Sequence, residues 1–332
     1  MGQRYARMRL DPFIALLLFT VLAATFLPAR GTVAGALGTL STVAIAILFF
    51  LHGARLPREN VTSAIRHWRL HLTILGTTFV VFPLLGFGLA SLWPQLLPAA
   101  IWTGVLFLCA LPSTVQSSIA FTSIAHGNVA GTVTSAAASN LLGIVLSPLI
   151  ASALVRSNAA AAPALHSIWK VLVQLLLPFV LGHLSRPWLA EWAARRKALL
   201  SITDRGTIVL AVYSSFSTAV IGGIWHQIPA TTIGVLLIVC AALLTVVLLL
   251  TRFGARVLGF GRRDEISTVF CGSKKSLVTG VPMARVMFSP ADAGAAILPL
   301  MLFHQLQLIV CAWLARRYAK QGVEEGLVDE MK

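Results

Sequence analysis

Charged residues are scarce in this sequence. Only 11% of its 332 residues are Asp, Glu, Lys or Arg, whereas 57% are hydrophobic. A soluble domain usually carries about 25% charged residues, so this composition excludes a chain whose main solvent is water. Apolar runs of about 20 residues, the length that crosses a bilayer, recur along the whole chain. We therefore expect an all-α membrane protein with many spans.

Other absences narrow the class of protein further. The chain has four cysteines, all inside apolar segments and without metal-ligand spacing, so we expect buried thiols and no disulfide framework. The net charge of +15 is not gathered into a basic patch with interleaved aromatic residues, so nucleic acid is not an expected partner. The spans lack acid pairs, metal triads and nucleophile-base constellations, so an enzyme is not expected.

The apolar runs predict ten transmembrane helices in one polytopic domain, residues 1–332. Short polar breaks delimit these helices to within a few residues. The expected spans are 11–28, 32–51, 70–92, 99–125, 129–154, 165–184, 206–224, 228–251, 266–288 and 292–315.

Basic residues predict the orientation of these spans. With the N-terminus in the cytoplasm, 20 of the 26 Lys and Arg residues fall on the cytoplasmic side and only four on the other side. The positive-inside rule therefore places both termini, including a tail at residues 316–332, on the cytoplasmic side of the cell (inner or plasma) membrane. The two basic residues left over are Lys274 and Lys275, which lie inside the ninth span.

The ten spans divide into two halves of five, residues 11–154 and 165–315. An odd number of spans per half makes the second half enter the membrane in the opposite sense, which permits an inverted repeat. In such folds the substrate site lies near the midplane, where discontinuous helices expose backbone groups. The fourth span of each half looks interrupted, so we expect the site there.

The fourth span, residues 99–125, changes from apolar to polar at Pro112. Proline lacks an N–H and disfavours helix at the residue before it, which frees carbonyls that need partners in a bilayer. The polar half carries one hydroxyl stripe and a glutamine: Thr114, Gln116, Ser117, Ser118 and Thr122. So many oxygen atoms beside a broken helix suit a hard cation, although such hydroxyls also let helices pack closely.

Neighbouring spans add further polar side chains. The fifth span has a second stripe that includes Thr132 and Asn140, and the third span offers Thr78 shortly before Pro83. Ion ligation and close packing of small residues explain these positions about equally well.

The ninth span, residues 266–288, contains both Lys274 and Lys275. An ionisable residue inside a membrane costs a few kcal/mol, so it normally faces a cavity or a partner. Snorkelling of the ammonium group to the interface is the main alternative. The helix is expected to break at three residues, Gly272, Gly280 and Pro282.

No carboxylate is available to neutralise the two lysines, because all 11 acidic residues lie in termini, loops or span ends. Three interpretations stay open. The ammonium groups meet carbonyl and hydroxyl oxygens, they lose a proton through desolvation, or they await an anion that arrives as substrate. Each interpretation requires that the two ammonium groups face a cavity in the protein.

Three stretches resemble a known family. They are "LPSTVQSSIAFTSIAHGN" at residues 111–128, "FCGSKKSLVTGVPMARVMF" at 270–288 and "LPLMLFHQLQL" at 298–308. Nearly the whole chain resembles the SBF-like branch of the bile acid/sodium symporter superfamily, which is represented by sodium-dependent transporters of bacteria. The second stretch is very specific to that branch.

The resemblance implies a ten-helix inverted-repeat fold with a panel domain and a core domain, in which the unwound helices four and nine cross. In bile acid symporters, sodium ions bind at this crossing. By position, their ligands map onto Ser117, Ser118, Thr132 and Thr78. The segment of helix nine that supplies a glutamate, backbone oxygens and a glutamine maps onto residues 270–275.

This chain departs from the family pattern at two positions. The glutamate position falls near Phe270 and the glutamine position near Lys274, so a carboxylate is missing and a fixed cation stands where oxygen is expected. An ammonium group in a former sodium site would make transport independent of sodium. An ammonium group that titrates would couple transport to protons.

These observations predict a secondary transporter for a small organic anion that works by alternating access. The expected ion ligands are Thr78, Thr114, Gln116, Ser117, Ser118 and Thr132. The expected substrate-binding residues are Asn140, Ser273, Lys274, Lys275, Ser276, His304 and Gln305. No cofactor is expected apart from Na+ as a coupling ion, and the sequence indicates neither the substrate nor the oligomeric state. The alternative is a membrane regulator or scaffold with a degenerate ion site.

Overall fold

The computed structural model of the chain describes residues 12–55, 67–158, 165–223 and 229–324. Every regular element in these ranges is a helix, which confirms the expected all-α class for them. The expected cytoplasmic N-terminus and the end of the expected tail lie outside the described residues. Residues 316–324 of that tail continue the last helix.

The first half of the chain alternates long helices with shorter segments. Its elements are α1 (Pro12–Phe26), α2 (Gly31–Ala54), α4 (Trp68–Gly76), the π-helical turn η1 (Thr77–Val81), α5 (Phe82–Leu92), the 3-10 turn η2 (Pro94–Leu96), α6 (Ala99–Ala110), α7 (Gln116–Ile124) and α8 (Val129–Asn158).

The second half follows a comparable order of long and short helices. Its elements are α9 (Leu165–Leu184), α10 (Arg186–Arg195), α11 (Lys197–Ile221), α13 (Ala230–Val257), α14 (Arg262–Gly272), α15 (Leu277–Met287) and α16 (Ala293–Glu324).

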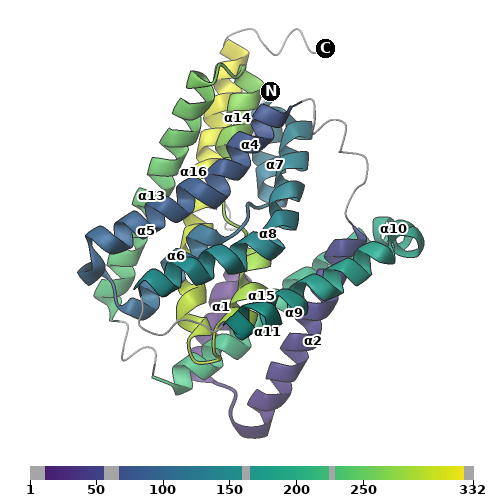
Figure 1. Cartoon of the computed structure of the whole chain (residues 1–332), viewed down its shortest axis with the longest axis vertical. Helices are drawn as coiled ribbons and strands as arrows, with labels where there is room; N and C mark the ends of the chain where they lie inside the picture. Colours follow the sequence, from purple (N-terminus) through teal and green to yellow (C-terminus); the bar gives the residue numbers. More distant parts are fainter. Residues whose placement is uncertain (1–11, 56–66, 159–164, 224–228, 325–332) are drawn as a thin grey trace, which may run out of the picture.

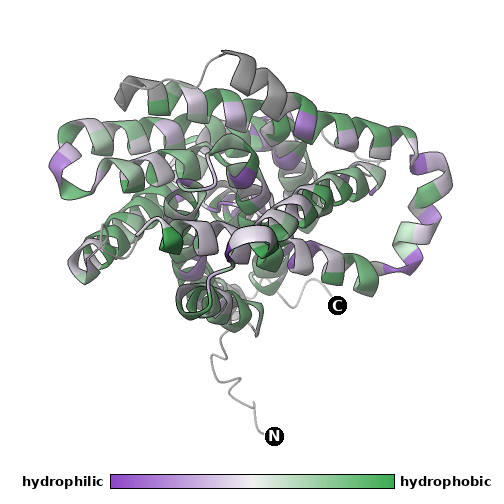
Figure 2. Ribbon diagram, turned by 90° about the horizontal axis from the view of Figure 1, so that it is seen from below, coloured by the Kyte–Doolittle hydropathy of each residue, from purple (hydrophilic) through white to green (hydrophobic). Residues whose placement is uncertain are grey.

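Within the described ranges, five helical segments are long and apolar enough to cross a membrane, at residues 31–54, 68–92, 129–155, 230–257 and 293–321. Large apolar side chains lie on the outer surface, among them Ile238 and Phe253 of α13, which are 69% and 67% exposed. Figure 2 shows hydrophobic residues along most of the helices. Water would disfavour so much exposed apolar surface, whereas lipid does not, so the helices are those of a multi-pass membrane protein.

The helices form two groups. Helices α1, α2, α9 and α11, here called the four-helix group, are joined by contacts of α1 with α11, α11 with α2, and α2 with α9. In the second group α16 packs on α6 and α13, and α14 packs on α13, α7 and α8. Figure 1 shows α2 and α9 on the opposite side of the molecule from α13 and α14. Helices α15 and α16 both contact α11 and so connect the groups.

Two glycines bring α2 and α9 into backbone contact. A β-carbon at Gly53 would overlap the carbonyl oxygen of Phe179, and one at Gly182 would overlap the carbonyl oxygen of Phe50. Only glycine fits at these two positions without a shift of the backbone. The pair α2 and α9 is therefore packed more closely than side chains would allow.

The fourth apolar segment is broken around Pro112. Helix α6 ends at Ala110 and α7 begins at Gln116, so residues 111–115 form the first break. Leu111 has an extended backbone (φ −72°, ψ 155°), the conformation that a following proline favours.

The ninth apolar segment is also broken, between Gly272 and Leu277. Residues 273–276 form this second break, and the hydroxyl oxygen of Ser276 caps α15 by accepting the backbone N–H of Thr279 (3.2 Å). A capped first turn explains why the helix resumes at Leu277.

Gly280 and Pro282, which the sequence predicts at the break, lie inside α15 instead. Pro282 removes one hydrogen bond from α15 without ending the helix. A β-carbon at Gly280 would overlap the side chains of Leu111 and Leu300. This glycine therefore allows α15 to pack closely on the first break and on α16.

Candidate functional site: two helix breaks beside a pocket

The two helix breaks lie against each other. The backbone N–H of Ser276 donates to the carbonyl oxygen of Pro112 (2.9 Å), and the hydroxyl of Ser113 donates to the carbonyl oxygen of Cys271. Asn140 on α8 donates from Nδ2 to the carbonyl oxygen of Ser113 (2.8 Å). Backbone groups without helical partners are thus bonded across the breaks, as a low-dielectric surrounding requires.

Lys275 lies in the second break and is 0% exposed. Its Nζ donates to three backbone carbonyl oxygens, those of Thr78 (2.8 Å), Cys109 (2.7 Å) and Leu111 (2.7 Å). The ring of Phe82 covers the ammonium group, with its centroid 4.1 Å from Nζ. Each of the three N–H groups of the ammonium therefore has an acceptor.

These three carbonyls are available because the helices that carry them are irregular there. Cys109 and Leu111 lie at the C-terminal end of α6, where carbonyls lack intrahelical N–H partners. Thr78 lies in the π-helical turn η1, which interrupts the regular helical ladder. The C-terminal end of a helix also carries partial negative charge, which favours a cation.

Gln307 on α16 holds the backbone of Lys275. The N–H of Lys275 donates to Oε1 of Gln307 (2.9 Å), and Nε2 of Gln307 donates to the carbonyl oxygen of Lys275 (3.0 Å). The same amide nitrogen lies 2.8 Å from Nδ1 of His304. Two hydrogen bonds from one buried side chain therefore fix the peptide from which the Lys275 side chain extends.

Lys274 is equally buried but has a different environment. Its Nζ has no hydrogen-bond partner among the described residues. It lies 4.1 Å from the ring centroid of Phe121 and 5.6 Å from that of Phe270. Aromatic faces attract a cation, but they do not accept its three N–H groups as oxygen atoms would.

The predicted hydroxyl stripe of the fourth segment gathers at the start of α7. The hydroxyl of Thr114 lies 2.8 Å from that of Ser117 and 3.1 Å from that of Ser118, and Ser118 donates to the carbonyl oxygen of Phe270 (3.0 Å). This group therefore joins α7 to the end of α14.

Other predicted ion ligands lie elsewhere in the core. The hydroxyl of Thr132 donates to that of Thr122 (3.2 Å). The carbonyl oxygen of Thr78 accepts from Nζ of Lys275, and the hydroxyl of Thr78 donates to the carbonyl oxygen of Ile74 one turn earlier. Ser273 likewise bonds back to the carbonyl oxygen of Val269.

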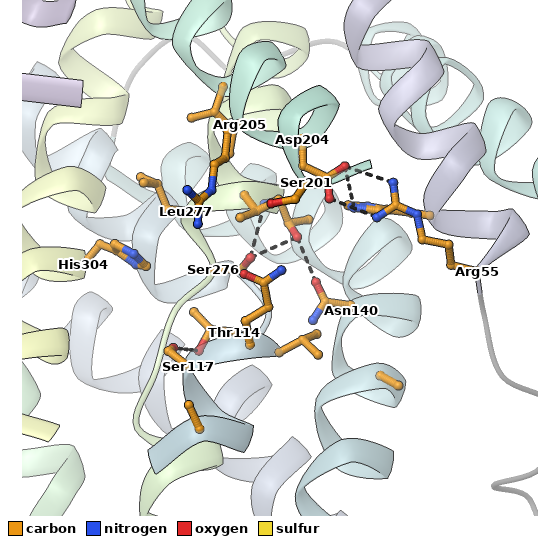
Figure 3. Close-up of a pocket in the computed structure, with 18 of the residues that line it drawn as sticks. Arg55, Thr114, Ser117, Asn140, Ser201, Asp204, Arg205, Ser276, Leu277 and His304 are labelled. Carbon is orange, nitrogen blue, oxygen red and sulfur yellow. Dashed lines mark hydrogen bonds and ion pairs between the residues drawn. The ribbon is translucent and has the colours of Figure 1, made fainter. Parts of the chain in front are cut away.

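A pocket of about 620 Å³ lies between the four-helix group and the two breaks. The four-helix group contributes Phe49, Phe179 and Ile208 to the apolar part of the pocket wall. The second group of helices contributes Phe121 and Leu308. Figure 3 shows Thr114, Ser117, Asn140 and Ser276 along the wall that carries the breaks.

The opposite wall of the pocket carries charge. Arg55 at the end of α2 makes two hydrogen bonds to the carboxylate of Asp204 on α11 (3.0 and 3.2 Å), and His52 lies 3.8 Å from the same carboxylate. Arg205, next in the chain, lies over the ring of Phe13 at 5.4 Å and has no ion pair among the described residues. Figure 3 shows Arg205 beside the pocket, near the Arg55–Asp204 pair.

The pocket includes some of the predicted residues and leaves out others. Those that line it are Thr114, Gln116, Ser117, Asn140, Ser276 and His304. Those outside its lining are Thr78, Ser118, Thr132, Ser273, Lys274, Lys275 and Gln305. Both lysines are thus behind the pocket wall in this conformation, and Oε1 of Gln305 is buried without a hydrogen-bond partner in the described part of the chain.

Sequence reasoning missed the charged wall. Arg55 and Arg205 are among the 20 basic residues that were counted only for orientation, and Asp204 is among the 11 acidic residues assigned to termini, loops or span ends. An acidic residue directly before an arginine at the start of a span was the available signal. In the described residues no group of three or more His, Cys, Asp or Glu side chains is placed to hold a metal ion.

Exposed apolar helices, two apposed helix breaks and a pocket beside them are features of a membrane transporter, and the family match assigns the chain to this class. The chain belongs to the SBF-like CPA transporter family, whose profile matches residues 11–320. The resemblance drawn from the three sequence stretches is therefore confirmed.

Two relatives illustrate this membership. The chain is 50% identical over 312 residues to "Putative symporter YfeH" of Escherichia coli (strain K12), with 94% of each chain covered. It is 27% identical over 316 residues to "Sodium/bile acid cotransporter 7" of Mus musculus, covering 92% of this chain and 91% of the mouse protein. The similarity therefore extends over nearly the full length of both relatives.

Proposed function

We propose that this protein is a secondary transporter that moves a small organic anion by alternating access. The observation that carries the proposal is the pocket of about 620 Å³ between the four-helix group and the two helix breaks. Pockets of roughly 300 to 1,000 Å³ hold small molecules. Pairing of broken helices with a solute site is the usual arrangement in transporters built from inverted repeats.

The chemistry of the pocket supports an amphipathic anion as the solute. Arg205 supplies a guanidinium group that no carboxylate among the described residues neutralises, whereas Arg55 is paired with Asp204. The remaining wall is mostly aromatic and aliphatic, with hydroxyl and amide groups at the breaks. The mouse relative is named for bile acid and sodium, which fits a solute with one acidic end and a large apolar body.

The positions of the two breaks support the ten-span, five-plus-five inverted repeat. Residues 111–115 and 273–276 each interrupt the fourth apolar segment of one half. The four-helix group then corresponds to the panel domain, and the remaining helices correspond to the core domain. The pocket lies between the two, so movement of one against the other would open it to alternate sides.

The charged wall supports a pocket that opens to the cytoplasm in this conformation. Arg55 and Arg205 line it, and the positive-inside rule assigns both to the cytoplasmic side. Both termini are then cytoplasmic, and the protein resides in the cell membrane as a multi-pass protein.

We also propose that Lys274 contacts the anion in another conformation. Phe121 lines the pocket on one side and lies against the Lys274 ammonium on the other, so a single ring separates the two. Rotation of this ring would bring an ammonium group without hydrogen bonds to the anion.

The hydroxyls of Thr114, Ser117 and Ser118, with the carbonyl oxygen of Phe270, are the proposed oxygen ligands for a coupling ion. Hydroxyl and carbonyl oxygens suit Na+, a hard cation. Coupling to Na+, to protons or to neither ion is decided by the flux measurement below.

The test is uptake of radiolabelled organic anions by purified protein in liposomes. The panel comprises bile acids and shorter carboxylates and sulfonates, each under a sodium gradient, a proton gradient or no gradient. Saturable uptake supports a carrier, and the gradient that accelerates uptake identifies the coupled ion. Absence of uptake across the whole panel contradicts the proposal and favours a membrane regulator with a degenerate ion site.

A matched pair of variants tests the pocket itself. Arg205→Gln is expected to raise the half-saturating anion concentration about tenfold, the effect of losing roughly 1.4 kcal/mol of binding free energy. Arg195→Gln is the control, because Arg195 is an exposed residue of α10 paired with Glu191. Equal half-saturation in both variants would exclude Arg205 as an anion contact.

A further inference from the structure

We infer that Lys275 is a tethered cation: its ammonium group fills a cation site made of three backbone carbonyls, so the two helix breaks are held together without a dissociable ion. Only the consequence for ion coupling rests on the proposed transport function. The cation site itself stands on the contacts of Lys275.

The surroundings of Nζ are those of a small cation site. Three carbonyl oxygens lie 2.7 to 2.8 Å from Nζ, and all three belong to the backbone. Two come from the C-terminal end of α6 and one from the π-helical turn η1. Unwound carbonyls and helix C-terminal ends are the groups that coordinate Na+ in transporters with broken helices.

The amine is placed by the chain and is not free to leave. Gln307 fixes the peptide of Lys275 through two hydrogen bonds, and the next residue, Ser276, donates its N–H to the carbonyl oxygen of Pro112. The cation therefore links three elements, namely the second break, the end of α6 and η1. A bound Na+ could link α6 and η1 in the same way, but it would also exchange with solution.

Neighbouring Lys274 shows that this arrangement is specific to one position. Its Nζ is equally buried but contacts the rings of Phe121 and Phe270 and, among the described residues, has no hydrogen-bond partner. Burial of a lysine in this protein therefore does not by itself require three carbonyl acceptors. Lys274 therefore provides a matched control that differs by one position in the sequence.

The inference has two consequences. Native protein binds no Na+ at the three carbonyls, because the Lys275 ammonium already occupies them. A coupling Na+ would bind at the hydroxyls of Thr114, Ser117 and Ser118 instead. Truncation of Lys275 to alanine leaves three buried carbonyls without a donor and a void the size of a propylammonium ion. Small cations should then bind in that void.

The test measures the unfolding temperature of the purified full-length chain in detergent at constant ionic strength. Wild type, Lys275→Ala and Lys274→Ala are each titrated with n-propylammonium, Na+ and choline, and with n-propanol as an uncharged compound of similar size. We expect Lys275→Ala alone to show a saturable rise with n-propylammonium, a smaller rise with Na+ and none with choline or n-propanol. Wild type and Lys274→Ala should not respond to n-propylammonium.

Several results would overturn the inference. One is a Lys275→Ala variant that responds to no cation, or to n-propanol as strongly as to n-propylammonium. Another is a wild-type unfolding temperature that rises with n-propylammonium as much as that of Lys275→Ala. If Lys275→Ala yields folded protein only when purified with n-propylammonium, that dependence supports the site. If it yields none under any condition, Lys275→Met is compared with Lys274→Met: equal unfolding temperatures contradict the cation site, and a lower temperature for Lys275→Met supports it.

Transport gives an independent readout. If wild-type uptake in liposomes requires Na+, Ser117→Ala should weaken that requirement, because Na+ would bind at the hydroxyl cluster and not at the carbonyls that Lys275 fills. A Na+ requirement that is unchanged in Ser117→Ala contradicts the tethered cation. Absence of any uptake would instead contradict the proposed transport function, while the unfolding measurement would still test the cation site. The two failures are therefore distinguishable.

Discussion

Lys274 and Lys275 are adjacent in the chain, equally buried and chemically identical, yet the protein treats them in opposite ways. Lys275 donates to three carbonyls and lies against Phe82, whereas the Lys274 ammonium lies near two aromatic rings and has no hydrogen-bond partner in the described structure. The two side chains leave the second break toward different surroundings. The Lys275 side chain points to the end of α6, and the Lys274 side chain points to the ring of Phe121, which lines the pocket.

The comparison teaches that an intramembrane charge is not by itself a substrate contact. A lysine whose donors are all satisfied is part of the fold, because removal of the donor would leave acceptors buried without partners. A lysine with unsatisfied donors is held at a cost in stability, which is a common feature of functional sites. The two positions should therefore separate stability from transport.

The largest expected effect is that of Lys275→Met. Methionine has a similar length but no donor, so three buried carbonyls lose their partner, and we expect the free energy of unfolding to fall by on the order of 4 kcal/mol. Thermal unfolding in detergent, with Lys274→Met as the control, measures the difference. If both variants unfold at the same temperature, the proposed difference between Lys275 and Lys274 in their contribution to stability is wrong.

The next largest effect should come from the residue that holds the Lys275 peptide. Gln307→Leu leaves a buried N–H and a buried carbonyl without partners, and we expect a loss of about 2 kcal/mol. Gln305→Leu is the matched control on the same helix, because its Oε1 already lacks a partner among the described residues. A larger loss in the control would show that Gln307 does not position Lys275.

The aromatic rings sharpen the comparison further. Phe82→Leu removes the ring over the Lys275 ammonium, whereas Phe107→Leu removes an equally buried ring that packs on Phe288. The cavity cost should be similar, so we expect Phe82→Leu to be more destabilising by about 1 kcal/mol, the cation–π contribution. Equal unfolding temperatures would mean that the ring adds only packing.

The smallest effect has the opposite sign. Lys274→Met removes an amine that has no hydrogen-bond partner in the described part of the chain, so we expect a gain of about 1 kcal/mol in stability. Anion uptake by the same variant should fall at least tenfold if Lys274 contacts the solute. A variant that is more stable and transports normally would remove Lys274 from the site.

Much of the helical framework could be predicted from the sequence, because apolar length and proline chemistry are local properties. The expected spans at 32–51 and 70–92 lie within α2 and within α4 to α5, and Pro112 lies in the first break. The second break was predicted too broadly, since Gly280 and Pro282 lie within α15. There the cap at Ser276 and close packing at Gly280 decide where the helix begins, and both depend on tertiary neighbours.

The candidate site was less accessible to sequence reasoning. The hydroxyls of Thr114, Ser117 and Ser118 cluster as their spacing of three and four residues predicts, although Thr114 lies in the first break and not on α7. The carbonyl cage cannot be predicted in that way, because it uses backbone oxygens of Cys109 and Leu111 that carry no side-chain signature. The Arg55–Asp204 pair joins residues 149 positions apart, so only the fold reveals that it forms a pocket wall.

The glycine contacts between α2 and α9 have a consequence for how such a protein can move. The carbonyl oxygens of Phe50 and Phe179 lie where a β-carbon at Gly182 or Gly53 would be, so the two backbones are in direct contact. In the proposed alternating-access movement we therefore expect α2 and α9 to move as one unit, and Arg55 at the end of α2 to move with them. That movement would have to change the contacts of α9 with α8 and α15 and those of α11 with α15 and α16.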